Sequence, residues 1–181
     1  VGILYFSLEQ WTNVMRKAGA ENVFEKYPDI EVVSRRGFTD PGESSSIVEG
    51  LLQSNPEIDA VWATWMMGPA TGAAEAIRSL NLEGEVIVAA PDLGGKVGAG
   101  YIADPEHPII GGAPADAIQM GRNSVRAALK YLLDQNKVPA NLYTVSRSYA
   151  ATRANLQWAY ETQTEGALGP LPQSTLDLLE D

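Results

Sequence analysis

The chain has 181 residues, of which 45% are hydrophobic, and a formal net charge of −10 at pH 7. This length suits one domain, the apolar content argues against disorder, and the acidic balance argues against nucleic acid or an anionic membrane as a partner. There is no cysteine, which excludes disulfides and thiolate chemistry, and the single histidine, His107, cannot form a histidine-rich metal site. We therefore predict neither a metal nor another cofactor, and we place His107 in a surface loop between Pro105 and Pro108.

Apolar runs of strand length alternate along the chain with amphipathic stretches of helix length. The run "VGILYF" (residues 1–6) predicts a first strand, and because the chain begins inside this pattern we expect it to be cut from a longer precursor. A helix is predicted over residues 10–27, and its expected buried stripe consists of Val14, Ala18, Val23 and Phe24. The further predicted strands are residues 30–33, 55–65, 85–90, 108–112 and 142–146, and the further predicted helices are residues 47–54, 68–80 and 116–136.

This alternation, with most strands continuously apolar, predicts an α/β fold in which helices sandwich a doubly wound, Rossmann-like parallel sheet. In such sheets ligands bind outside the carboxyl ends of the strands. The segments at those ends read "FSLEQW", "TWMMG" and "APDLGG". They contain the candidate ligand-binding residues Glu9, Trp11, Trp65, Met66, Met67 and Asp92.

Motifs for catalysis are weak. "GGKVGAG" (residues 94–100) matches neither the dinucleotide-binding pattern nor the P-loop, so we interpret it as a loop or a helix start. No G-x-S-x-G motif is present. Glu9 and Asp92 follow two different strands and are the only pair we consider for glycosidase-like chemistry, in which the separation of the carboxylates decides. We predict that the protein is not an enzyme, and a nucleotide-dependent enzyme stays the third hypothesis.

Aromatic side chains also fall near the candidate cleft. Flat rings pack on the apolar face of a sugar, but they are equally large core residues. Trp11 and Trp65 fit both readings, whereas Trp62, in the middle of a predicted strand, fits the core.

In their order along the chain, several motifs resemble the C-terminal lobe of type I, ribose-type periplasmic binding proteins and the related effector domains of lac-repressor-type regulators. The resemblance covers about 150 residues. The matching segments are Arg16 and Gly19 on the first helix, "YPDIEVV", "LLQSNPEIDAVWAT", "GAAEAI", "EVIVAAPD" and "MGRNSVRAALKYLLDQNKVP".

The resemblance implies roles for individual residues. Arg16 matches an arginine that forks onto sugar oxygens, and Asp92 matches an aspartate that accepts hydrogen bonds from sugar hydroxyls. Met66 and Met67 stand where the family has an Asn-Asp pair, so the sequence departs from the pattern at that strand end. We expect the ligand to be less polar there than ribose, or the wall to be out of use.

The resemblance also implies an organisation. Residues 1–160 would form the C-terminal lobe of a two-lobe protein whose N-terminal lobe is absent from this chain, and residues 161–181 would form a tail over the surface. The helix of residues 118–133 would pack on the absent lobe, so we predict that it is reused in self-association. Its expected apolar stripe is Ile118, Val125, Leu129, Leu132 and Leu133.

Two functions follow from the resemblance. The first is the extracytoplasmic solute-binding component of an ABC-type importer, which closes its lobes on a sugar-like molecule and presents it to a membrane permease. The second is the ligand-binding effector domain of a transcription regulator of the lac-repressor type.

Overall fold

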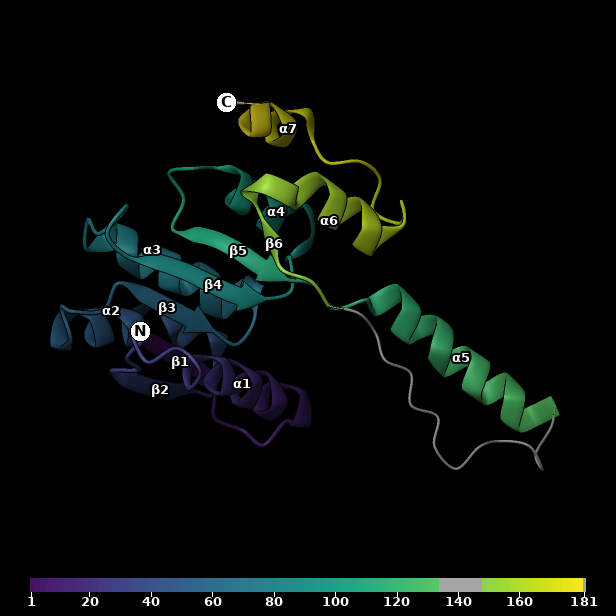
Figure 1. Ribbon diagram of the computed structural model, residues 1–181, viewed down its shortest axis with the longest axis horizontal. Coiled ribbons are helices and arrows are strands. Elements are labelled where there is room, and N and C mark those ends of the chain that lie inside the picture. The colour runs from purple at the N-terminus through teal and green to yellow at the C-terminus, as the bar shows by residue number, and fades with distance from the viewer. Residues whose placement is uncertain (134–147, 181) are drawn as a thin grey trace.

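The structure is a computed structural model that describes residues 1–133 and 148–180. It contains a six-stranded sheet with the order β2-β1-β3-β4-β5-β6, in which β6 alone is antiparallel to its neighbour (Figure 1). The strands are β1 (Gly2–Phe6), β2 (Ser34–Phe38), β3 (Ala60–Ala63), β4 (Ile87–Pro91), β5 (Ile109–Ala113) and β6 (Ala151–Thr152). The predicted doubly wound α/β architecture is confirmed.

Helices lie on both faces of the sheet. They are α1 (Trp11–Phe24), α2 (Ser44–Ser54), α3 (Thr71–Ser79), α4 (Gly95–Ala103), α5 (Ala117–Leu133), α6 (Leu156–Thr164) and α7 (Gln173–Glu180). Contacts with the strands place α2, α3 and α4 against one face. On the other face, the ammonium of Lys17 in α1 lies 5.1 Å from the ring centroid of Tyr5 in β1.

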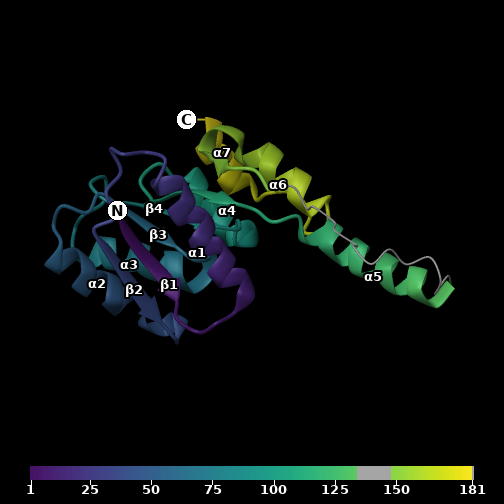
Figure 2. The same cartoon turned by 60° about the horizontal axis from the view of Figure 1, so that its bottom comes forward.

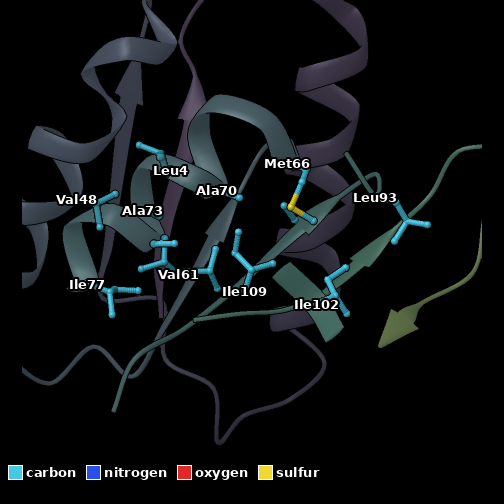
Figure 3. Close-up of a cluster of buried hydrophobic side chains, with 14 of the residues drawn as sticks. Leu4, Val48, Val61, Met66, Ala70, Ala73, Ile77, Leu93, Ile102 and Ile109 are labelled. Carbon is cyan, nitrogen blue, oxygen red and sulfur yellow. The ribbon is translucent and has the colours of Figure 1, made fainter. Parts of the chain in front are cut away.

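The core lies between the sheet and the layer formed by α2, α3 and α4 (Figure 3). Strand residues such as Leu4, Val61 and Ile109 meet helix residues such as Val48 and Ile77, and all five are at most 1% exposed. Burial of a side chain of this size contributes about 1.5–3 kcal/mol, so this layer supplies most of the stabilisation that apolar burial provides.

The opposite face of the sheet is only partly covered. An apolar depression of about 290 Å³ runs between Trp62 on β3 and Ala151 on β6, and Ile110 in its floor is 46% exposed. The buried stripe predicted for α1, which lies over this face, is wrong: Val14 and Val23 are 43% and 49% exposed. A helix over a half-open face has no second layer into which its apolar side chains can pack.

The second strand lies later in the chain than predicted. The pattern indicated residues 30–33, but β1 pairs with Ser34–Phe38, starting from Gly2 opposite Ser34. As an edge strand with two exposed arginines, β2 needs no continuous apolar run, and only Phe38 is buried. Asp40 caps the turn before α2 by accepting the backbone N–H of Gly42 at 2.8 Å.

Past β4 the glycine-rich segment forms α4, in line with the helix start that the sequence allowed. Beyond it, the prediction of a surface histidine is wrong. His107 is 6% exposed, its ring stacks on Tyr101 at 4.4 Å, and its Nδ1 accepts the backbone N–H of Ile109 at 3.1 Å. Burial lowers the pKa of His107 to about 4, so the ring is neutral in the folded protein.

The last part of the chain contains a helix that leaves the main body. In both views α5 extends away from the sheet (Figures 1 and 2), and its stripe residues Val125, Leu129 and Leu132 are at least half exposed. Its C-terminal end packs nowhere on the described part of the chain, while Arg122 forms a bidentate pair with Glu165. The predicted strand at residues 142–146 and the predicted end of the helix at residue 136 lie outside the described residues.

The expected tail contains ordered structure. Residues 160 and 161, where the sequence divided lobe from tail, both lie inside α6, and α7 packs on α4 with Leu171 buried beside it. None of the helices in the described residues combines the length and the apolar character needed to cross a membrane.

Candidate functional site

The carboxyl ends of β1, β3 and β4 meet at one edge of the sheet. The parallel register places Gly2 opposite Val61 and Ala60 opposite Ile87, so the residues that follow these strands emerge side by side. Ligands in open α/β sheets bind at this edge. The candidate site is built from the turns that follow these strands and from the first half of α1.

Asp92 begins the turn after β4. Its φ is 65°, a left-handed conformation that Asp tolerates better than most residues. Its Oδ1 accepts the backbone N–H of Gly94 at 3.0 Å, and the backbone N–H of Met66 faces the carboxylate and favours its ionised form. Burial raises the pKa of Asp92, and the nearby Arg16 opposes that rise. The carboxylate is therefore half-buried but partly satisfied.

Arg16 reaches the same edge from α1. Its Nη1 donates to the backbone carbonyl of Thr64, at the end of β3, at 3.4 Å. Its charge also acts on Asp92, so the structure brings together two residues that lie 76 positions apart in the sequence (92 minus 16). Among the described residues this one long contact to a carbonyl leaves most of the five guanidinium N–H groups available for a ligand.

A polar residue that the sequence analysis missed lies beneath Arg16. Asn13 is 5% exposed, its Nδ2 donates to Oε1 of Gln10 at 2.6 Å, and its Oδ1 accepts the hydroxyl of the buried Thr64 at 3.4 Å. Asn13 precedes Arg16 by three positions, so the two share a helix face. The three-residue spacing of Asn13 and Arg16 on the predicted helix was the signal in the sequence that could have indicated Asn13 as a site residue.

The two methionines after β3 separate. Met66 is fully buried, points into the core near Leu93 (Figure 3), and offers the site only its backbone N–H. Met67 is 44% exposed. Between Met66 and Ala70 the chain makes an irregular turn in which Gly68 has φ 107°, and within this turn one methionine is buried and the next is exposed.

The aromatic candidates differ in the same way. Trp65 packs edge-on against Phe6 and Phe38, with ring centroids 5.5 Å and 5.3 Å away, and its indole N–H donates to the carbonyl of Met67 at 2.7 Å. It therefore supports the turn. Trp11, on the first turn of α1, is 75% exposed and free to contact a ligand.

Glu9 lies in the exposed loop between β1 and α1. It lines a cavity of about 240 Å³ together with Tyr5 and Lys17. Of the predicted residues, Arg16 lies near enough to Asp92 to act on its pKa, and Met66 and Met67 lie against Gly94 in the turn that Asp92 begins.

Comparison with known proteins shows to which family the chain belongs. A family model described as the periplasmic binding protein domain matches residues 1–137, which is more than half of the chain. The chain belongs to the periplasmic binding protein family. A search of curated proteins found no match.

Solved structures of similar fold include several periplasmic binding proteins. A carbohydrate transporter solute binding protein from Agrobacterium radiobacter, in complex with D-arabinose, has 25% identity and a TM-score of 0.74, over 90% of this chain and 54% of that one. An ABC transporter solute binding protein from Bacillus halodurans C-125, with bound myo-inositol, has 26% identity and a TM-score of 0.70, over 90% and 54%. A 5-methylthioribose transporter solute binding protein from Thermotoga lettingae has 22% identity and a TM-score of 0.73, over 99% and 58%.

These periplasmic binding proteins confirm the resemblance drawn from the sequence motifs. The chain spans little more than half the length of each of the three. All three are solute-binding proteins by description, and the two with at least 25% identity bind a sugar or a polyol.

Proposed function

We propose that this chain is part of a solute-binding component of an ABC-type importer and that it binds a sugar or a sugar-like molecule. The observation that carries the proposal is that Arg16, whose guanidinium donates to the carbonyl of Thr64 at the end of β3, and the half-buried Asp92 carboxylate after β4 lie at the same carboxyl edge of the sheet. A guanidinium, which donates several N–H groups, and a carboxylate, which accepts, together bind vicinal hydroxyls, because each hydroxyl both donates and accepts. The bound ligands of the related structures support the same class.

In this proposal residues 1–160 form one lobe and a second lobe closes over the ligand. Arg16 and Asp92 are both partly buried at an open edge, which suits a half-site completed by another surface. Hinge closure around a ligand is the usual mechanism of such proteins. We further propose an extracytoplasmic location and a membrane permease as the partner of the closed form, both from family membership.

Isothermal titration calorimetry tests sugar binding. The chain, produced at its full natural length, is titrated with D-arabinose, D-ribose, D-allose and myo-inositol. We expect at least one to bind, and Arg16→Gln or Asp92→Asn to weaken that binding about tenfold or more, the loss typical of a charge-assisted hydrogen bond.

Matched controls are Arg36→Gln, which removes an exposed arginine of β2, and Asp29→Asn, which removes an exposed carboxylate in the segment before β2. Both should leave the dissociation constant unchanged. If no sugar or polyol binds, or if the Arg16 and Asp92 variants bind as the controls do, the proposed site is wrong.

The exposed stripe of α5 carries a second proposal, that the 181-residue chain self-associates through this helix. Leu129, Leu132 and Leu133 are 50%, 68% and 82% exposed and lie on one helix face. Water contact at several large apolar side chains in a row is unfavourable, and a second copy of the helix relieves it.

A further inference from the structure

Given the proposed sugar-binding function, we propose that Met67 determines the class of ligand, and that this class is sugars with an apolar group, such as a deoxy carbon or a thiomethyl group, where common sugars carry a hydroxyl. The inference rests on the position of the Met67 thioether against Gly94, the residue whose N–H is hydrogen-bonded to Asp92. It also rests on the lack of any free polar side chain at the end of β3.

The thioether lies against Gly94, which follows Asp92 by two positions. A Cβ atom added to Gly94 would be 3.0 Å from Sδ and 3.2 Å from Cγ of Met67, and 2.7 Å from Cγ of the buried Met66, so both side chains lie on this glycine and Met67 is the exposed one. The backbone N–H of the same glycine donates to Oδ1 of Asp92. A ligand that gives a hydroxyl to Asp92 therefore has the Met67 side chain at its flank.

Met67 is also held in place. The indole N–H of Trp65 binds its carbonyl at 2.7 Å, and Trp65 is itself packed between Phe6 and Phe38. The turn continues through Gly68, whose N–H donates to the hydroxyl of Thr71 at 3.0 Å. The backbone of Met67 is thus held in the wall of the site, while its exposed, flexible thioether can adapt to a ligand.

No other side chain of residues 64–67 offers a hydrogen bond there. Thr64 is buried and bonded to Asn13, Met66 is buried, and the only donor of Trp65 is already used. A thioether sulfur is a weak acceptor and no donor. A ligand hydroxyl pressed against it loses water without a replacement, which is unfavourable, whereas a methyl or thiomethyl group gains from contact.

The experiment compares sugars that differ at one position. Titration calorimetry on the chain at its full natural length uses D-ribose against 5-deoxy-D-ribose and 5-methylthio-D-ribose, and L-galactose against L-fucose. We expect the deoxy or thiomethyl member of a pair to bind about tenfold tighter or more, the factor typical of one buried, unpaired hydroxyl.

Variants assign the preference to Met67. Met67→Gln, which places an amide at similar length, should abolish or reverse the ratio within a pair, and Met67→Leu should keep it. Met120→Gln is the matched control, since Met120 is 55% exposed on α5, away from the site. Circular dichroism shows whether each variant is folded.

The outcomes separate the two proposals. If sugars bind but the hydroxylated members bind as tightly as their partners, or if Met67→Gln leaves the ratio unchanged, this inference is wrong and the sugar-binding function stands. If no member of the panel binds, both are overturned.

Discussion

Asp92 and Gly94 are joined by a hydrogen bond of 3.0 Å from the glycine N–H to the aspartate Oδ1, across a turn in which both residues have positive φ, 65° and 62°. The turn aims the carboxylate at the open edge of the sheet and gives it a donor in place of lost water. Asn tolerates the same left-handed conformation and keeps an acceptor oxygen.

Asp92→Asn is therefore expected to stabilise the unliganded fold at pH 7 while it weakens ligand binding. Because burial raises the pKa of Asp92 above its ordinary value, the ionised carboxylate is less favourable in the folded than in the unfolded chain. The cost is present at neutral pH and disappears as the pH falls below the ordinary pKa, near 4, where both states are protonated. Urea unfolding at pH 7 and at low pH measures it, and an equal or lower stability of the variant at pH 7 would contradict the prediction.

His107 is expected to make the fold sensitive to mild acid. Its pKa falls from 6.5 to about 4 through burial, so the unfolded chain binds a proton first as the pH drops. The neutral His107 ring contributes fully to the free energy of unfolding above about pH 6.5, and this contribution is lost progressively as the pH falls toward 4. The loss of unfolding free energy between pH 7.5 and pH 5 is about 2 kcal/mol.

Urea unfolding of the native protein and of His107→Gln at the two pH values isolates this term, since all carboxylates titrate in both proteins. The variant should lose less stability between pH 7.5 and pH 5. Parallel losses in the two proteins would show that His107 is not the responsible group.

Ser44 is expected to be replaceable with a gain in stability. Its Oγ is buried and, among the described residues, has no hydrogen-bond partner. Ser44→Ala removes this unsatisfied oxygen and should stabilise the fold by about 1 kcal/mol. Ser46→Ala, in the same turn of α2, is the control, because the Ser46 hydroxyl is exposed and already donates to the carbonyl of Glu43 at 3.0 Å. A lower melting temperature for Ser44→Ala would reveal a partner for its hydroxyl.

The stripe of α5 is expected to control the oligomeric state. Light scattering after size exclusion should give a dimer or a larger species for the 181-residue chain and a monomer for Leu129→Gln combined with Leu132→Gln. Met120→Gln alters the opposite side of the helix and should leave the mass unchanged. A monomeric native chain would refute self-association.

The sequence by itself determined the fold class, because the alternation of strand-length and helix-length apolar patterns is a local property that each segment carries independently. It also located Asp92, since a carboxylate directly after a buried strand of a parallel sheet falls at the binding edge whatever the details of packing. Arg16 was predicted as a site residue from the family resemblance and not from the hydrophobic periodicity. Its approach to Asp92 is visible only in the folded chain.

Tertiary structure decided the rest. Met66 and Met67 are neighbours of identical chemistry, and only the turn through Gly68 separates a core side chain from an exposed one. The polar edge strand β2 and the buried His107 escaped local patterns because pairing with β1 and stacking on Tyr101 are long-range or specific contacts. A hydrophobic period indicates which residues form an apolar face. Contacts with segments distant in the sequence decide which of these residues are buried.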